Sequence, residues 1–420
     1  MARSVGTATV GGTMITDAVL PAAPHLLGAD ARELLHAALA STGERVLTAR
    51  PSQVAYRPGR SLLVRYAAEV ERVDGSRAMD TIMALTTAGD LPDKVVPLEA
   101  GGLRVGVWRY PFDPALPGLP PATSGRRVRE LLDRLAGPPG QVALRTRAYR
   151  PQRRAVVQAT VHGHDVPRTV LFLKVLPPDR AARVHATHLA LDAAGVAVPR
   201  SVGLAAQQGI VALTAVPGMT LQDALCDGLP VPDPAELCAL QQRLAGAPLD
   251  TAARPAAMID PSRHAALLTA TLPDEGGRVA ELAARCAPGD RDGSRPVTVH
   301  GDLYEAQVLV AQGAITGLID LDGAGPGYLA DDAATLIGHL ETLAMVRPRA
   351  AHRIRAYAAE TFAACAAVTD PVVLARLVAA VCLGLATGAF RVQEPGWEDE
   401  ARRRLDLAAS WLDKVSDRGT

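Results

Sequence analysis

Hydrophobic positions in the first part of the chain repeat every second residue, which is typical of half-buried strands. A helix precedes them over residues 30–39, with Asp30 as its N-cap. The strands are predicted over residues 54–56, 62–70, 81–86, 95–98 and 103–108. The Pro-rich residues 111–121 read as a linker or an irregular cover, and residues 125–135 read as a helix.

This order of elements is repeated along the chain. Residues 55–60 (AYRPGR) return as residues 148–153 (AYRPQR), and each copy is followed by a strand, a Gly-containing turn and a third strand. The third strand of the second copy is predicted over residues 169–175 (TVLFLKV). The repetition indicates an internal duplication of a β-rich module.

After the second copy the hydrophobic period changes to that of helices. A helix is predicted over residues 179–194, and strands over residues 198–204 and 209–216. Asp233, Pro234 and Glu236 combine an N-cap, a first-turn proline and an N3 glutamate. Helices are predicted over residues 234–244, 262–271, 277–286, 331–345, 347–367, 371–390 and 398–415. The sequence therefore predicts an α+β protein with three parts, residues 1–140, 141–216 and 217–420.

Candidate chemistry gathers in residues 297–336. Short apolar runs there are followed by His300-Gly301-Asp302, by Gln307, and by Asp320 with Asp322. Transfer of a phosphoryl group needs a carboxylate that accepts a hydroxyl proton and oxygen ligands that hold Mg²⁺ against nucleotide phosphates. The order and spacing of these residues supply both. A hairpin with acidic loop residues is the simpler alternative.

This stretch resembles the catalytic core of the aminoglycoside phosphotransferase and choline kinase-like family, which shares the protein-kinase fold. The family pattern is HGDxxxxN, a strand with a metal-binding Asp, and a Gly followed by a structural Asp. The matching positions are His300, Gly301, Asp302, Asp320, Gly327 and Asp332. Gln307 stands where the family usually has Asn. The resemblance implies a bilobal fold with a β-rich N-lobe and a helical C-lobe, to which the first β-rich module is an addition.

The roles of the catalytic residues follow from this resemblance and from the chemistry. Asp302 is expected to accept the proton of the acceptor hydroxyl, and His300 to brace the loop by hydrogen bonds. Asp320 is expected to bridge Mg²⁺ to the β and γ phosphates, and Gln307 to bind a metal through its amide oxygen. Asp322 is either a further metal or acceptor contact or a cap of the following loop.

Lys174 lies within the apolar run of residues 169–175, although only three of the 44 basic residues are lysines. It resembles the strand lysine that touches the nucleotide α and β phosphates, and an edge-strand lysine is the alternative. The helix over residues 179–194 takes the place of the family's αC but contains no Glu. Lys174 is therefore oriented otherwise, or its usual partner is replaced.

Other nucleotide contacts are expected around this strand. No GxGxxG precedes Lys174, and residues 126–154 carry nine arginines against two acids. Guanidinium groups suit phosphate oxygens, so Arg153 or Arg154 replaces the glycine amides, or the two belong to a solvated hairpin tip. Val216 lies at the segment that resembles the family's hinge, where backbone groups meet the nucleobase.

The composition of the chain bears on its expected partners and location. Its formal net charge is zero, and no aromatic residues interleave with the arginines, so nucleic acid is not an expected partner. The five cysteines are odd in number and widely spaced, as in cytoplasmic proteins with reduced thiols. The first residues lack the pattern of a secretion signal, and no membrane segment is predicted. No pattern in the sequence specifies an oligomeric state.

The sequence thus predicts a small-molecule kinase that transfers the γ-phosphoryl group of ATP or GTP, with Mg²⁺, to a hydroxyl. An antibiotic or another natural product is the favoured acceptor, and a sugar or an amino alcohol is the alternative. A hypothesis of another class is a catalytically silent nucleotide- or ligand-binding protein of the same fold. The missing αC Glu and the Gln for Asn suggest it, whereas Asp302, Asp320 and Lys174 argue against it.

Overall fold

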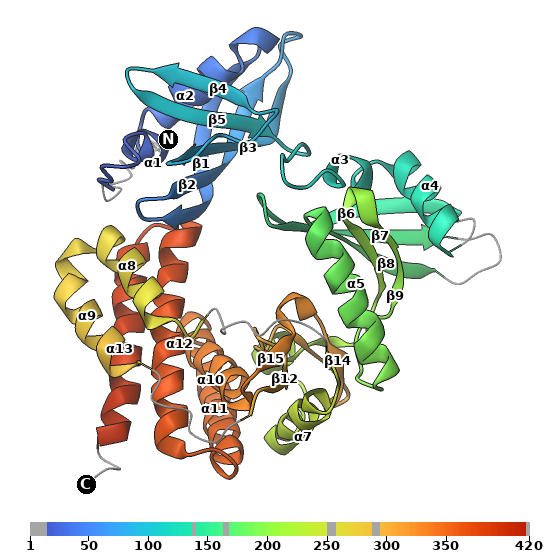
Figure 1. Ribbon diagram of the computed structural model, residues 1–420, viewed down its shortest axis with the longest axis vertical. Coiled ribbons are helices and arrows are strands. Elements are labelled where there is room, and N and C mark those ends of the chain that lie inside the picture. Colours follow the sequence, from blue (N-terminus) through green and yellow to red (C-terminus); the bar gives the residue numbers. More distant parts are fainter. Residues whose placement is uncertain (1–14, 137–139, 163–167, 250–257, 288–294, 417–420) are drawn as a thin grey trace, which may run out of the picture. The chain divides into compact units, whose positions relative to one another are not determined.

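The structure is a computed structural model that describes residues 15–136, 140–162, 168–249, 258–287 and 295–416. It confirms a mixed α+β, protein-kinase-like fold with an additional N-terminal sheet (Figure 1). The chain divides into two compact units. Unit 1 holds Met1–Tyr110, Ala265–Val279 and Ala386–Arg403, and unit 2 holds Pro111–His264, Ala280–Leu385 and Arg404–Thr420. Residues 1–14 of the predicted first part lie outside the described residues.

The sheet of unit 1 is antiparallel, with strand order β1-β2-β3-β5-β4. Helices α1 and α2 pack against it. Its elements are α1 (Ala23–Leu27), α2 (Ala31–Ala38), η1 (Ala40–Thr42), β1 (Arg45–Arg57), β2 (Ser61–Glu71), β3 (Arg77–Thr87), β4 (Val96–Ala100) and β5 (Leu103–Arg109). β1 starts earlier than the predicted strand over residues 54–56. Two register shifts, at Val46/Thr48 and Pro51/Gln53, interrupt the alternation on which that prediction depended.

The N-cap predicted for Asp30 is wrong. Asp30 precedes α2, but its backbone is helical and its carboxylate accepts no hydrogen bond from the helix. The carboxylate instead lies 2.7 Å from Nδ1 of His25. The cap predicted at Asp233 is confirmed, because its side chain accepts a hydrogen bond from the Ala235 amide at 2.8 Å.

The sheet of unit 2 has the same strand order, β6-β7-β8-β10-β9, and is antiparallel as well. Two helices precede its first strand, as in unit 1, so the structure confirms the duplication. The second copy adds helix α5 between its third and fourth strands. Its elements are α3 (Leu119–Ala122), α4 (Gly125–Ala136), β6 (Gln141–Arg150), β7 (Arg154–His162), β8 (Thr169–Val175), α5 (Pro178–Ala193), β9 (Ser201–Ala205), η2 (Ala206–Gln208) and β10 (Ile210–Thr214).

The strand registers show which residues of the two copies correspond. The first pair beside the shared hairpin is Arg57 with Ser61 in unit 1 and Arg150 with Arg154 in unit 2. Continuing across each sheet, the position of Lys174 corresponds to that of Leu85. In the first copy, the hydroxyl residue Ser61 therefore stands at the position of Arg154, and the apolar Leu85 stands at the position of Lys174.

The remaining elements are mostly helical. Apolar side chains from α6, α7, α10 and α11 form a core together with those of β13 and β14. The elements are β11 (Met219–Thr220), α6 (Leu221–Asp227), α7 (Pro234–Ala245), α8 (Pro261–Thr271), η3 (Pro273–Glu275), α9 (Gly276–Arg285), β12 (Val297–Val299), β13 (Val308–Ala311), β14 (Ala314–Leu318), η4 (Leu321–Gly323), β15 (Gly325–Gly327), α10 (Leu329–Val346), α11 (Ala351–Ala366), α12 (Pro371–Val392) and α13 (Trp397–Ser416).

Helix α12 is the one described helix that is long and apolar enough to cross a membrane by length and composition. Within the structure, 67% of its most apolar stretch is buried. Burial of this kind is what the central helix of a protein core requires, and such helices pass the same test of length and composition.

Candidate active site

The site begins at a loop that only glycine can form. Strand β12 ends at Val299 and leads into His300 and Gly301. Gly301 has a φ of 78°, and a Cβ atom there would lie 2.6 Å from the carbonyl oxygen of Gly323. A larger residue would therefore push the loop away from the segment that carries Asp320 and Asp322.

Asp332 holds this loop from helix α10. Its carboxylate accepts hydrogen bonds from the backbone amides of His300 at 2.7 Å and Gly301 at 2.9 Å. Burial raises the pKa of Asp332 to about 7, although these two amides act in the opposite direction. The structural Asp expected from the resemblance therefore has a defined contact, which fixes the entry into the catalytic loop.

His300 is completely buried behind the loop. Its Nε2 lies 2.9 Å from the carbonyl oxygen of Ile319, which can only accept, so Nε2 carries the proton. Burial lowers the pKa of His300, and the imidazole is neutral. These contacts fit the bracing role and tie the catalytic loop to the segment that precedes Asp320.

Two carboxylates and two cations meet at the centre of the site. Arg154 makes a bidentate contact with Asp320, at 2.8 and 2.6 Å, and a single contact with Asp322 at 3.1 Å. Lys174 lies 2.8 Å from Asp320 and 2.5 Å from Asp322. These four residues, named here the charge cluster, come from β7, β8 and the segment around η4, and the contacts join residues up to 168 positions apart.

The charges of the cluster keep Asp320 ionised. Burial alone would raise the pKa of Asp320, but the positive charges of Lys174 and Arg154 hold it below its usual range. Asp320 also has a left-handed backbone, with φ 62° and ψ 49°. Such a conformation costs about 1 kcal/mol or more outside glycine and persists mainly where a site needs it.

The donor set fits a magnesium ion that is shared with phosphates. No group of three or more His, Cys, Asp or Glu gathers anywhere in the described ranges. Mg²⁺ in nucleotide sites takes only one or two carboxylates, with phosphates and water completing the octahedron. Asp320 and Asp322 would supply those carboxylates. The side-chain nitrogen of Gln307 lies 3.3 Å from Asp320, so its amide must turn before its oxygen can act as a ligand.

Comparison with known families decides the assignment. The model of the phosphotransferase enzyme family (APH) matches residues 158–368, which is half of the chain. The chain belongs to the phosphotransferase enzyme family. The matched region contains Lys174, the catalytic loop, Asp320 and Asp332, so the predicted resemblance is confirmed.

Solved structures of aminoglycoside phosphotransferases are similar to this phosphotransferase in outline. A thermostable mutant of APH(4)-Ia in its apo form is 15% identical, covers 70% of this chain and 99% of its own, and has a TM-score of 0.45. The GDP complex of wild-type aminoglycoside 2'-phosphotransferase-IIIa is 13% identical, covers 69% and 99%, and has a TM-score of 0.46. No curated protein matches the sequence. Similarity this distant says nothing about substrate, and the assignment rests on the family model.

The other predicted site residues lie at different depths. Asp302 follows Gly301 in the catalytic loop and is half-buried, and its negative charge contributes to the raised pKa values of Tyr304 and Asp332. Arg153 is exposed at the turn between β6 and β7, whereas its neighbour Arg154 is part of the charge cluster. Val216 is half-buried in the segment after β10 and approaches Gly317 of β14.

The structure also decides between the two interpretations of Lys174. Strand β8 lies between β7 and β10 in the interior of the sheet, so Lys174 is not an edge-strand residue. Its side chain is buried against the two carboxylates of the charge cluster. The two acids of α5, Asp179 and Asp192, are both exposed. The place of the αC Glu is therefore not taken by another acid of this helix.

The contacts of Asp113 were not predicted from the sequence. The carboxylate of Asp113 accepts hydrogen bonds from the Tyr149 hydroxyl and the Gln152 amide, both at 2.8 Å. This contact fixes the β6–β7 hairpin, which leads into Arg154. In unit 1, Asp17 holds the Tyr56 hydroxyl and the Gly59 amide in the same way, also at 2.8 Å. A signal was present, because residues 17–21 (DAVLP) and 113–117 (DPALP) repeat each other.

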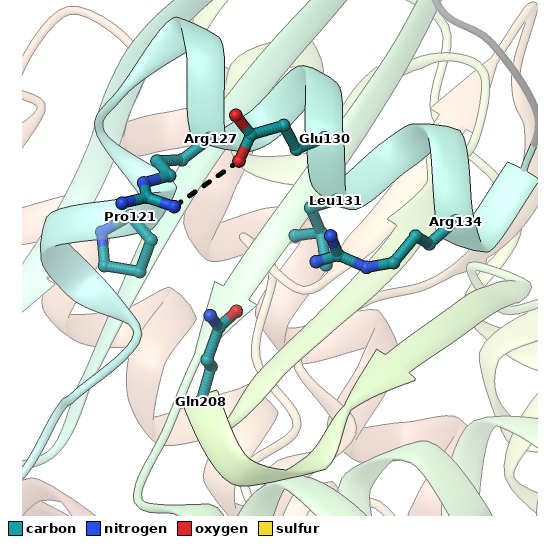
Figure 2. Close-up of a pocket in the computed structure, with 6 residues that line it drawn as sticks. All are labelled: Pro121, Arg127, Glu130, Leu131, Arg134 and Gln208. Carbon is teal, nitrogen blue, oxygen red and sulfur yellow. Dashed lines mark hydrogen bonds and ion pairs between the residues drawn. The ribbon is translucent and has the colours of Figure 1, made fainter.

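A pocket of about 200 Å³ lies between helix α4 and η2 (Figure 2). It is lined by Pro121, Arg127, Glu130, Leu131, Arg134 and Gln208. An ion pair of 3.5 Å joins Arg127 to Glu130 across its rim. None of the predicted site residues lines this pocket, so it has no part in the chemistry of the charge cluster.

Proposed function

We propose that this phosphotransferase transfers the γ-phosphoryl group of ATP or GTP to a hydroxyl group of a small molecule. An antibiotic or another natural product is the proposed acceptor class, and the five free thiols support a cytoplasmic setting. The observation that carries the proposal is the meeting of Lys174 and Arg154 with two carboxylates beside a catalytic loop held by Asp332.

The reaction forms one P–O bond and breaks another. The acceptor oxygen attacks the γ-phosphorus, the bond to the β-phosphate oxygen breaks, and a nucleoside diphosphate leaves. The hydroxyl proton passes to the carboxylate of Asp302. Because the transition state is loose, the protein contributes mainly alignment and neutralisation of charge.

Each member of the charge cluster has a task when the nucleotide is bound. Asp320 and Asp322 would hold Mg²⁺, which neutralises the charge that develops on the phosphate oxygens. Lys174 and Arg154 then exchange carboxylate partners for phosphate oxygens, for which ammonium and guanidinium groups are suited. The buried setting of the cluster strengthens each of these contacts relative to water.

A screen with γ-labelled nucleotide tests the proposal. The full chain is incubated with Mg²⁺·ATP or Mg²⁺·GTP and a panel of aminoglycosides, other hydroxylated natural products, sugars and amino alcohols. Labelled product from one class, lost on addition of a chelator, is the expected result. Transfer to sugars or amino alcohols alone would assign the acceptor to the alternative class.

The competing hypothesis is a catalytically silent nucleotide- or ligand-binding protein of the same fold. Its support is that α5 offers no buried acid to Lys174. Titration calorimetry with Mg²⁺·ATP and Mg²⁺·GTP separates the two. Nucleotide binding without labelled product from any acceptor class would favour the silent protein. Absence of nucleotide binding would contradict the kinase and would leave a silent protein that binds another ligand.

A further inference from the structure

Helix α5 packs against strands β9 and β10 of the second sheet (Figure 1). Lys174 stands directly opposite Val211 in the β8–β10 ladder, and cross-strand partners project from the same face of a sheet. Val211 packs in one cluster with Ala181 and Val184 of α5. The apolar side of α5 is therefore turned toward the lysine.

His188 lies on this same side of α5, four residues after Val184, which is about one helical turn. It is 1% exposed. Helix α5 also contacts η4, the turn that contains Asp322. His188 is thus a buried polar residue on the helix that packs against strand β10, the neighbour of β8, and against the acidic turn.

The hydrogen bonds of His188 determine its chemical form. Its Nδ1 lies 2.7 Å from the carbonyl oxygen of Pro199, which can only accept, so Nδ1 carries the proton. Burial first, and then the positive charge of Lys174, lower the pKa of His188 to about 4. The ring is therefore neutral, and its Nε2 presents a lone pair.

That lone pair has no partner within the part of the chain that the structure describes. Nε2 of His188 is buried and accepts no hydrogen bond from any described residue. A buried acceptor without a donor costs about 1–3 kcal/mol, so native structures seldom keep one without a reason. The ammonium of Lys174 has three donors, and its charge is close enough to act on the His188 ring.

We propose that His188 replaces the missing αC acid as the positioning residue for Lys174, with Nε2 accepting a hydrogen bond from the ammonium group when the nucleotide is bound. This role rests on the proposed function, because Lys174 needs a new partner only when Asp320 and Asp322 turn to Mg²⁺. The first sheet is consistent with it: that copy has Leu85 in place of Lys174 and no helix between its third and fourth strands.

Three variants separate this role from packing. His188→Gln keeps an acceptor near the position of Nε2, His188→Asn keeps a donor near the position of Nδ1 for Pro199, and His188→Leu keeps neither. The dissociation constants of Mg²⁺·ATP and Mg²⁺·GTP are measured by calorimetry, with the melting temperature of each variant as control. We expect about tenfold weaker binding for His188→Leu and His188→Asn, and near wild-type binding for His188→Gln.

The opposite pattern would overturn the role. Binding restored by His188→Asn but not by His188→Gln would assign His188 to the Pro199 contact alone. Equal losses in all three variants with lowered melting temperatures would assign it to packing, and unchanged binding in His188→Leu would remove it from the site. A wild-type chain that binds neither nucleotide would overturn the proposed function and this role together.

Discussion

At the scale of single residues, the catalytic loop combines one half-buried carboxylate with buried residues that hold the loop in place. Asp332 and His300 are buried and hold the loop through backbone contacts. Asp302 is half-buried. Under the proposed function, this division makes Asp302 the loop carboxylate that accepts the proton of the acceptor hydroxyl, whereas the neutral, enclosed His300 is confined to its bracing contact.

Replacing Asp302 tests its role as proton acceptor. Asp302→Asn keeps the shape of the side chain but removes the basic oxygen. We expect kcat to fall by about 10² to 10⁴ fold, the usual scale for loss of a general base. Nucleotide affinity, measured by calorimetry, should stay close to that of the wild type. Turnover at the wild-type rate would exclude Asp302 from proton transfer.

A second residue of the loop makes stability depend on pH. Glu305 is 3% exposed, and its Oε2 has no hydrogen-bond partner within the described ranges. Burial raises the pKa of Glu305 from 4.5 to about 7. The folded chain therefore binds this proton more tightly than the unfolded chain does. The free energy of unfolding should fall as pH rises from about 4.5 to about 7.

Glu305→Gln replaces the titrating carboxyl by a neutral amide. The free energy of unfolding of this variant should therefore fall less as pH rises. Because one pKa unit corresponds to about 1.4 kcal/mol and the pKa of Glu305 rises from 4.5 to about 7, we expect the variant to gain on the order of 3 kcal/mol over the wild type at pH 8 and little at pH 4. Urea unfolding at a series of pH values measures the difference. A difference between the two chains that does not change with pH would show that folding leaves the pKa of Glu305 unshifted.

At the scale of elements, the two carboxylate contacts that fix the hairpins make a matched pair. Asp113 holds the β6–β7 hairpin, which leads into Arg154, and Asp17 holds the β1–β2 hairpin, which leads into Ser61. The local contacts are alike, but only one of the hairpins carries a member of the charge cluster.

Removing each carboxylate should therefore have different consequences. Asp113→Ala leaves the Tyr149 hydroxyl without its partner, and we expect a loss of about 1–3 kcal/mol in stability. The Michaelis constant for nucleotide should rise with it, because Arg154 loses its fixed position. Asp17→Ala should lower stability but leave that constant unchanged. Similar kinetic changes in both variants would contradict the separation.

Elements whose signals are local could be predicted from the sequence. The apolar run of residues 169–175 matches β8 exactly, and the cap at Asp233 forms as expected. The prediction was less successful where tertiary contacts decide. Bulges in β1 hid most of that strand, and Asp30 binds His25 rather than the helix amides.

The same limit applies to the site. The spacing of His300, Asp302 and Asp320 indicated the chemistry, because their segments adjoin in the chain. The partners of Lys174 could not be predicted, since Asp320 and Asp322 lie about 150 residues away and reach it only through folding. The choice between Arg153 and Arg154 was likewise open until the sheet register placed one at the charge cluster and the other in solvent.

At the scale of the whole molecule, the two copies of the sheet share one arrangement but differ in the residues at a few positions. They share strand order, preceding helices and hairpin contacts. They differ at Ser61 and Leu85, where the second copy has Arg154 and Lys174, and in helix α5, which only the second copy has. Under the proposed function all three differences concern the binding of phosphate, so we expect nucleotide chemistry to be confined to the second copy.

Arginines of the two hairpins test this division. The double variant Arg57→Ala with Arg60→Ala removes exposed cations of the first copy and should leave the Michaelis constant for nucleotide within about twofold, since surface charges contribute little. Arg154→Ala removes a half-buried guanidinium from the charge cluster. Because hydrogen bonds to charged groups are worth about 1.5–3 kcal/mol, we expect that constant to rise by about 10 to 100 fold.

Arg153→Ala is the matched control, since it is the exposed neighbour on the same hairpin. Initial rates at varied Mg²⁺·ATP measure all the variants, with melting temperatures to confirm folding. Loss of stability or of acceptor binding in the double variant, with an unchanged nucleotide constant, would give the first copy a role apart from phosphate. If the double variant instead raised the Michaelis constant for nucleotide as much as Arg154→Ala does, both copies would contribute to nucleotide binding.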